Sequence, residues 1–397
     1  MPTEAPRFRG WLSEVRNLSA GTFPPFVTSR HGDAPDIGLP VFVYHTIKPA
    51  SFEADLRFLS TNGYETLDAD SFYAILTGQK EHRGTEVLLT IDDGRSSVWT
   101  HAYPLLKRHG HRAVVFAIPG CVPDRGLLAR ESGERKRSGQ QEEAVGKRDL
   151  GLMSWEELKK AHRDSVLDIQ SHTMFHRQVP VHSDVEDFVS PETDSPFYAV
   201  AVPLDIDVAS PDSLRELAGL PIFRSEPLLS ASVVYQELPE VLNAPRDLVQ
   251  RHRGDDFFQQ SDWRRTLLST VQDARQLSRE NGRYLEPSEV RDAILEDLTK
   301  AKAIIERRLE GKKVNHLCLP FAAGSELAIE LAREAGYQSV FWGSRRDRPA
   351  NTVGDDPFHC VRLKHDYVRR LPGRGRRSLF RILLGKVLRR LQGEAVY

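Results

Sequence analysis

The chain has 397 residues, of which 40% are hydrophobic and 28% are charged, and its formal net charge is −1 at pH 7. This composition excludes a disordered chain, and the near-zero charge excludes a general electrostatic attraction to nucleic acid. The three cysteines, Cys121, Cys318 and Cys360, lie far apart, which argues against a disulfide framework or a zinc ribbon.

The first segment, residues 1–37, is interpreted as an N-terminal extension. Its first 30 residues lack the apolar core of a signal peptide, and no apolar run in the chain is long enough to cross a bilayer. We therefore expect a cytoplasmic protein, with peripheral contact to a membrane and no nucleic-acid partner.

A repeated pattern organises much of the chain after this extension. Apolar residues recur at helical spacing, end at a glycine and lead into an apolar strand. The glycines are Gly63, Gly110, Gly311 and Gly336. A glycine at the end of a helix accepts the left-handed conformation that closes the helix. Because strands that alternate with helices pair in parallel, the pattern predicts an α/β fold.

Two polar strings follow apolar runs of this pattern. Thr90–Gly94 reads Thr-Ile-Asp-Asp-Gly after Val87–Leu89, and Ser171–His176 reads Ser-His-Thr-Met-Phe-His after Val166–Ile169. Taken alone, the first is typical of a turn and the second of a surface histidine pair. Together, two carboxylates and two histidines offer three ligands for a divalent metal and leave one carboxylate as a base. Their placement at strand ends favours this second interpretation.

The two strings resemble the motifs of the polysaccharide deacetylase (NodB-homology) family, carbohydrate esterase family 4. These motifs are Thr-Phe-Asp-Asp-Gly and His-Ser/Thr-x-x-His, and Ile91 stands here in place of the phenylalanine. The resemblance implies a distorted (β/α) barrel with Asp93, His172 and His176 as metal ligands and Asp92 as the general base. The metal it implies is zinc, with Co²⁺, Ni²⁺, Mn²⁺ and Fe²⁺ as alternatives.

Two later stretches extend the resemblance. Pro320 and Phe321 match the end of an Arg-x-Pro-Tyr-like motif, but Cys318 stands where the arginine normally orients the base. We consider Arg95 as a replacement and assign Arg95, Pro320 and Phe321 to substrate binding. Leu-Lys-His, ending at His365, resembles the closing Leu-x-His of the family, whose histidine protonates the departing amine.

The barrel is expected over residues 38–365, interrupted twice. Residues 124–149 are highly charged and predict a mobile surface loop. Residues 177–286 form an insertion after the metal-binding histidines, interpreted as a lid or subdomain over the substrate or as a peripheral decoration.

The C-terminal tail, residues 366–397, combines many arginines with apolar residues that share one helical face. Those apolar residues are Phe380, Leu383, Leu384, Val387 and Leu391. A basic amphipathic helix predicts contact with an anionic membrane surface. The alternative is a helix that closes the barrel and keeps its basic face in water.

The expected function is hydrolysis of the N-acetyl amide of an amino sugar in a glycan or glycan precursor, with release of acetate. One alternative is a catalytically silent glycan-binding or scaffold protein of a membrane-associated glycan-assembly system. Another is a related metal amidohydrolase that acts on a different acyl group, such as a deformylase or a cyclic amidase.

Overall fold

The computed structural model describes residues 22–29, 37–124, 151–193, 196–345 and 347–391. The chain divides into two compact units. Unit 1 comprises Met1–Phe116, Glu157–Gln170 and Gln338–Tyr397, and unit 2 comprises Ala117–Glu156 and Ser171–Tyr337. Most of the predicted N-terminal extension and nearly all of the predicted charged loop lie outside the described residues.

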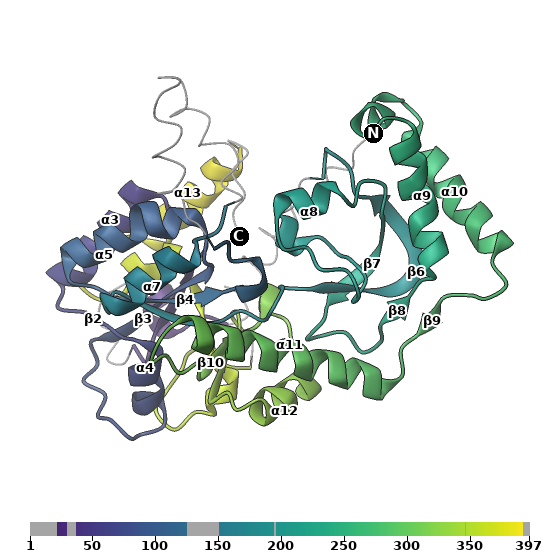
Figure 1. Ribbon diagram of the computed structural model, residues 1–397. Helices are drawn as coiled ribbons and strands as arrows, with labels where there is room; N and C mark the ends of the chain where they lie inside the picture. Colours follow the sequence, from purple (N-terminus) through teal and green to yellow (C-terminus); the bar gives the residue numbers. More distant parts are fainter. Residues whose placement is uncertain (1–21, 30–36, 125–150, 194–195, 346, 392–397) are drawn as a thin grey trace. The chain divides into compact units, whose positions relative to one another are not determined.

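Unit 1 is an α/β unit (Figure 1). Its strands are β1 (Val41–Tyr44), β2 (Glu65–Thr66), β3 (Glu86–Asp93), β4 (Ala113–Ala117), β5 (Leu167–Ser171), β11 (Ser339–Phe341) and β12 (Leu363–Lys364). Its helices are α2 (Pro25–Thr28), α3 (Pro49–Thr61), α4 (Ala69–Leu76), η1 (Val98–Ala102), α5 (Tyr103–His109), α7 (Trp155–Arg163), η6 (Pro357–His359), η7 (His365–Arg370) and α13 (Leu379–Leu391). The last residues of β4 and β5 and the first two of α7 are counted with unit 2.

The sheet of unit 1 has the order β5-β4-β3-β1-β12, with β2 beside β3. Strand β1 pairs in parallel with both β3 and β12, in a register that sets Phe42 opposite Leu89 and Leu363. Every residue of β3 is buried, as expected for a strand covered on both faces. This confirms the predicted parallel α/β class.

The glycine-terminated helices are also confirmed. Helix α5 ends at Gly110, which has φ of 69° and donates its backbone N–H to the carbonyl of Leu106, and β4 follows three residues later. Helix α3 is followed by Gly63 at φ of 71°. In unit 2, α12 precedes Gly336 at φ of 79°. In each case, glycine permits the left-handed turn out of the helix.

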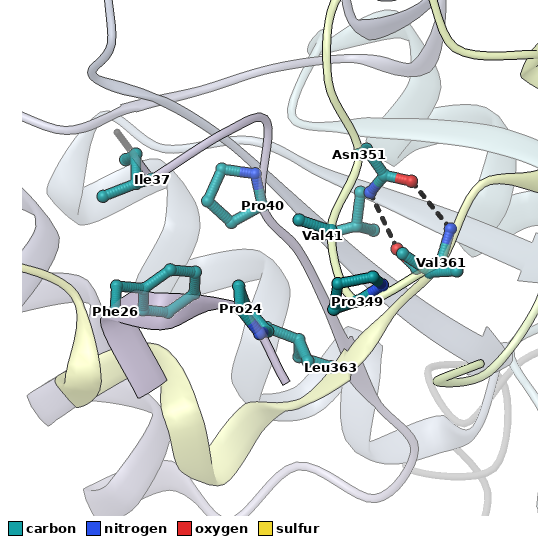
Figure 2. A pocket seen from close by; sticks show the side chains of 10 residues that line it. Pro24, Phe26, Ile37, Pro40, Val41, Pro349, Asn351, Val361 and Leu363 are labelled. Carbon is teal, nitrogen blue, oxygen red and sulfur yellow. Dashed lines mark hydrogen bonds between the residues drawn. The ribbon is translucent and has the colours of Figure 1, made fainter. Parts of the chain in front are cut away.

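The segment before β1 packs into unit 1 beside β12. Figure 2 shows a small apolar hollow lined by Pro24, Phe26, Pro40, Val41 and Leu363, with Asn351 at its edge. The Asn351 side chain donates to the Val361 carbonyl at 2.8 Å and accepts from the Val361 N–H at 2.7 Å. This pair of hydrogen bonds fixes the chain immediately before Arg362.

Unit 2 contains the insertion. Its strands are β6 (Gln178–Phe188), β7 (Pro221–Pro227), β8 (Tyr235–Gln236), β9 (Arg283–Tyr284) and β10 (His316–Cys318). Its helices are η2 (Pro119–Cys121), η3 (Phe197–Ala199), α8 (Pro211–Arg215), α9 (Pro239–Arg251), η4 (Gly254–Gln259), α10 (Trp263–Leu277), α11 (Pro287–Arg308), η5 (Pro320–Ala322) and α12 (Glu326–Glu334).

The insertion is a folded substructure with its own apolar core. Strands β6 and β7 form an antiparallel pair, and α9 and α10 contact each other along their lengths (Figure 1). Trp263, Leu267 and Val271 of α10 are buried with Phe188 and Val241. Residues 177–286, which the sequence analysis interprets as an insertion, fall within unit 2. Among the described residues, no helix has both the length and the hydropathy required to span a membrane.

Candidate active site

Asp92 and Asp93 are the last two residues of β3, and both are buried. The backbone of Asp93 has φ of 69°, and Gly94 follows at 71°. An extended strand cannot continue through left-handed residues, so β3 ends here. The predicted change from strand to loop at the Asp-Asp-Gly string is confirmed at Asp93.

The carboxylate of Asp92 is held by Arg362. The guanidinium Nη1 lies 2.6 Å from Oδ1, and Nη2 lies 2.9 Å from Oδ2, while Nε donates to the carbonyl of Trp342 at 2.9 Å. Both side chains are buried. Such a two-bond pair fixes the plane of the carboxylate as well as its charge.

Arg362 was missed in the sequence. It directly precedes β12, and the parallel pairing of β12 with β1 and of β1 with β3 brings it to Asp92. The available signal was a lone arginine in the otherwise apolar run Val361–Leu363. Cys318 replaces the motif arginine, and Arg362 supplies a guanidinium to the predicted base.

Arg95 contacts the other aspartate. Its Nε and Nη2 each lie 3.0 Å from Oδ2 of Asp93, and Nη1 donates to the hydroxyl of Thr46 at 2.9 Å. The sequence interpretation considered Arg95 as the replacement that orients Asp92, but the two-bond partner of Asp92 is Arg362. Arg95 instead helps to balance the second buried charge.

Two histidines lie in this part of unit 1. His45, directly after β1, has Nε2 3.7 Å from Oδ2 of Asp92, and partial burial lowers its pKa against the attraction of Asp92. The predicted His365 stacks on Tyr44 with ring centroids 4.7 Å apart, and burial lowers its pKa against the attraction of Asp366. The sequence analysis missed His45, although this histidine directly follows a buried strand, as the motif residues do.

His172 and His176 lie together in unit 2, directly after β5, and both are buried. Their ring centroids are 4.8 Å apart. Nδ1 of His172 lies 2.9 Å from the carbonyl oxygen of Cys318. A carbonyl only accepts, so the ring proton is on Nδ1 and the lone pair is on Nε2. A backbone carbonyl commonly orients a metal-binding histidine in this way.

The turn between the two histidines is held by a buried carboxylate and a glycine. The N–H of Met174 donates to Oδ1 of Asp297 at 2.9 Å, and its carbonyl accepts from the N–H of Gly120 at 2.9 Å. Burial raises the pKa of Asp297 to about 6, against the lowering effect of the Met174 hydrogen bond. These contacts fix the turn from both sides of its backbone.

Aromatic side chains surround His176. Phe321 of η5 has its ring centroid 4.5 Å from that of His176 and is 45% exposed, while Pro320 before it is buried. Tyr198, from the insertion, packs edge-on against His176 at 5.7 Å. The insertion therefore contributes to the immediate surroundings of a predicted metal ligand.

Left-handed backbone conformations are concentrated at the predicted site residues. Asp93, His176 and Phe321 have φ of 69°, 57° and 55°, and Thr173 has 66°. A non-glycine residue in this conformation is uncommon and is retained where the surrounding structure enforces it. Ser165 and Arg253 adopt the same conformation away from the motifs, so the strain supports the motif residues without singling them out.

The donor chemistry fits a divalent metal. Asp93, His172 and His176 are buried, and each offers one ligand atom. Carboxylate and imidazole groups are ligands that suit zinc and the other first-row divalent ions.

Comparisons with known proteins agree with these motifs. Residues 79–193 match the family model described as polysaccharide deacetylase. The chain is 34% identical over 101 residues to YxkH of Bacillus subtilis (strain 168), whose name describes it as a polysaccharide deacetylase. That alignment covers 23% of this chain and 36% of YxkH, so the chain spans about a third of the length of this relative.

Two solved structures are similar to the chain. A de-N-acetylase from Aggregatibacter actinomycetemcomitans is 16% identical with a TM-score of 0.48, covering 82% of this chain and 94% of the other. IcaB from Ammonifex degensii is 18% identical with a TM-score of 0.45, covering 84% and 95%.

Proposed function

We infer that the chain belongs to the polysaccharide deacetylase family, whose model matches residues 79–193 and whose distorted (β/α) barrel is the fold class seen here. From this premise we propose that the protein is a metal-dependent amidase. It removes the N-acetyl group of an amino sugar in a glycan or glycan precursor and releases acetate.

The observation that carries the metal dependence is the hydrogen bond between Nδ1 of His172 and the carbonyl of Cys318. This bond assigns the lone pair to Nε2 in a buried ring that lies beside a second buried imidazole. We propose Asp93 as the third ligand to the same ion, because the carboxyl ends of neighbouring parallel strands lie at one edge of a sheet and β3 and β5 are both neighbours of β4.

A divalent ion held by these residues would supply Lewis acidity, which would polarise the acyl carbonyl and lower the pKa of water. Asp92 takes the proton from the attacking water, and its two bonds to Arg362 keep the carboxylate ionised and aligned. The water oxygen bonds to the acyl carbon, the C–N bond then breaks, and the leaving amine receives a proton. His365 is the proposed donor, and His45 is the second candidate because of its contact with Asp92.

The exposed face of Phe321 supports binding of a sugar. Its ring packs against His176 and presents an apolar surface to solvent, and Tyr198 of the insertion lies on the same histidine. Aromatic rings offer apolar area for the C–H face of a pyranose. We propose that Pro320, Phe321 and Tyr198 contact the substrate. Arg95 contributes indirectly, by holding the carboxylate of Asp93.

The alternative of a silent glycan-binding protein depended on the missing motif arginine. The contact between Arg362 and Asp92 removes that reason, because the base has a guanidinium partner from another strand. Hydrolysis of a formyl or cyclic amide uses the same residues, so only substrate specificity separates it from deacetylation.

The test combines metal content with acetate release from a panel of N-acetylated sugars and oligosaccharides. The wild-type chain should bind one divalent ion and release acetate. His172→Ala and His176→Ala should lose the ion, while His182→Ala, a control at an exposed histidine of the same unit, should keep it. Asp92→Asn should keep the ion and lose roughly 10²–10⁴-fold in rate, because an amide cannot accept the proton.

Each part of the proposal has its own contrary result. Unchanged metal content in both histidine variants would reject the ligand assignment. Hydrolysis by Asp92→Asn at the wild-type rate would move the base elsewhere. Release of formate or opening of a cyclic amide, without acetate, would reassign the substrate class.

A further inference from the structure

Helix α13 packs on unit 1 through its charged residues. Lys386 is only 1% exposed on its side chain, with Nζ 3.4 Å from Oδ2 of Asp366 and 4.3 Å above the ring of Tyr367. Arg389 donates to the other oxygen of Asp366, and Ile382 is buried. Burial alone would raise the pKa of Asp366, but the attraction of Lys386, His365 and Arg389 holds it at about 2.

The opposite side of the helix is apolar and exposed. Phe380, Leu384 and Leu388 are 73%, 45% and 51% exposed. Residues four apart lie on one face of a helix, so these three form a single outward row. The helix therefore has the reverse of the arrangement found on ordinary surface helices, whose apolar face points inward. We call Phe380, Leu384 and Leu388 the outer row.

The structure changes which residues form the apolar face that both sequence-based interpretations of the tail assumed. Those treated Phe380, Leu383, Leu384, Val387 and Leu391 as one apolar face. In the structure Phe380 and Leu384 are exposed, whereas Leu383 and Val387 are half-buried. A helix that simply closed the barrel would bury its apolar face and leave its cations in water. Here Lys386 and Arg389 bind Asp366 instead.

The surroundings of the outer row are positively charged. Arg374, Arg377 and Arg381 are exposed, and Arg377 and Arg381 lie three residues before Phe380 and Leu384. The sequence from residue 367 to residue 393 contains no aspartate or glutamate. A partner for this surface must therefore be apolar where it meets the row and negatively charged around it.

We propose that the outer row inserts into the surface of an anionic lipid bilayer, with Arg377 and Arg381 at the level of the phosphate headgroups. A bilayer surface offers both properties at once, an acyl region a few ångströms beneath a layer of negative charge. Phenylalanine and leucine on one face beside arginines are typical of helices that lie in that interface. This inference does not depend on the proposed deacetylation.

The test uses the full chain and sedimentation with vesicles of phosphatidylcholine alone or mixed with phosphatidylglycerol. The wild-type chain should bind the anionic vesicles, and added salt should weaken binding because exposed charges are screened. Leu384→Gln/Leu388→Gln should lower the partition coefficient about tenfold or more, since two leucines no longer leave water. Arg377→Gln/Arg381→Gln should remove most of the preference for anionic lipid.

The matched control is Leu268→Gln/Leu277→Gln, which replaces two exposed leucines of α10 by the same residues. It should bind vesicles as the wild-type chain does. Thermal unfolding should be unchanged in all these variants, because each position is exposed. As an independent measurement, Phe380→Trp should show more tryptophan fluorescence than the wild-type chain. Brominated lipid should quench this added fluorescence.

Three outcomes would overturn the proposal. These are no binding of the wild-type chain to anionic vesicles, equal binding by the outer-row variant and its control, and no quenching of Phe380→Trp. A dimer in solution that Leu384→Gln/Leu388→Gln dissociates would assign the outer row to a second copy of the chain instead.

Discussion

The carboxylate pair at the end of β3 and the histidine turn after β5 are stabilised in opposite ways. Asp92 and Asp93 are each held by a buried guanidinium. The histidine turn is held by the neutral carbonyl of Cys318, by Gly120, and by Asp297, a buried carboxylate with a raised pKa. Ion pairs stabilise the carboxylate pair, whereas hydrogen bonds that involve the backbone stabilise the histidine turn.

The difference follows from what each group must do. A buried carboxylate that stays ionised needs a cation, since desolvation disfavours the charged form. An imidazole that offers a lone pair must stay neutral, and protonation of its second nitrogen would remove that lone pair. The two regions should therefore respond differently to removal of a charged side chain, to a change of pH and to an increase in side-chain volume.

The largest effect is expected in the carboxylate region. Arg362→Met leaves the Asp92 carboxylate buried without its two-bond partner, and removal of one member of a buried ion pair costs about 3–5 kcal/mol. Urea unfolding at neutral pH measures the loss. Adding Asp92→Asn to this variant should recover most of it, because no unpaired charge then remains.

The control for this comparison is Arg112→Met. Arg112 pairs with Asp68 at 2.8 Å on the surface, where such a pair contributes about 1 kcal/mol or less. An Arg362→Met chain that unfolds like the control would show that the guanidinium does not stabilise Asp92.

A smaller, pH-dependent effect is expected in the histidine turn. The pKa of Asp297 rises from 3.8 to about 6 on folding, so the folded chain binds this proton more tightly than the unfolded chain. This proton therefore raises the free energy of unfolding by up to about 3 kcal/mol below about pH 4. The added stability is lost as the pH rises through 6.

Asp297→Asn should remove this dependence, because its amide oxygen still accepts from the N–H of Met174 but cannot ionise. Relative to the wild-type chain, the variant should gain stability between pH 4 and pH 7. Asp212→Asn, at an exposed carboxylate of α8, is the control and should show no such gain. Parallel pH profiles for Asp297→Asn and the wild-type chain would contradict the assignment.

The smallest expected loss of stability comes from steric overlap rather than from a change of charge. A Cβ at Gly120 would lie 2.5 Å from Phe175 and 2.6 Å from the Met174 carbonyl, so Gly120→Ala must displace the histidine turn. Overpacking of this kind costs about 1–3 kcal/mol. Calorimetric unfolding and zinc titration should both show a loss.

Gly385→Ala provides the matched control, because a Cβ there meets nothing within 4 Å and its position in α13 favours alanine. The control should be neutral or slightly stabilising. Equal zinc affinity in Gly120→Ala and Gly385→Ala would mean that the turn tolerates displacement.

Local sequence patterns were sufficient to predict the helices and strands and to single out the motif residues. The glycines after α3, α5 and α12 and the apolar runs before Asp92 and His172 are signals contained within a dozen residues, because helix ends and buried strands depend on neighbouring residues. The family match agrees with the class predicted from them.

The partner of Asp92 and the orientation of α13 were decided by tertiary structure alone. Arg362 is 270 residues away from Asp92 and meets it only because β12 pairs with β1 in one particular register. The periodicity of α13 is the same whichever face points inward, and the half-buried Asp366 selects the face of Lys386 and Arg389. Both outcomes depend on where a buried charge finds its counter-charge, and no local pattern in a sequence records that pairing.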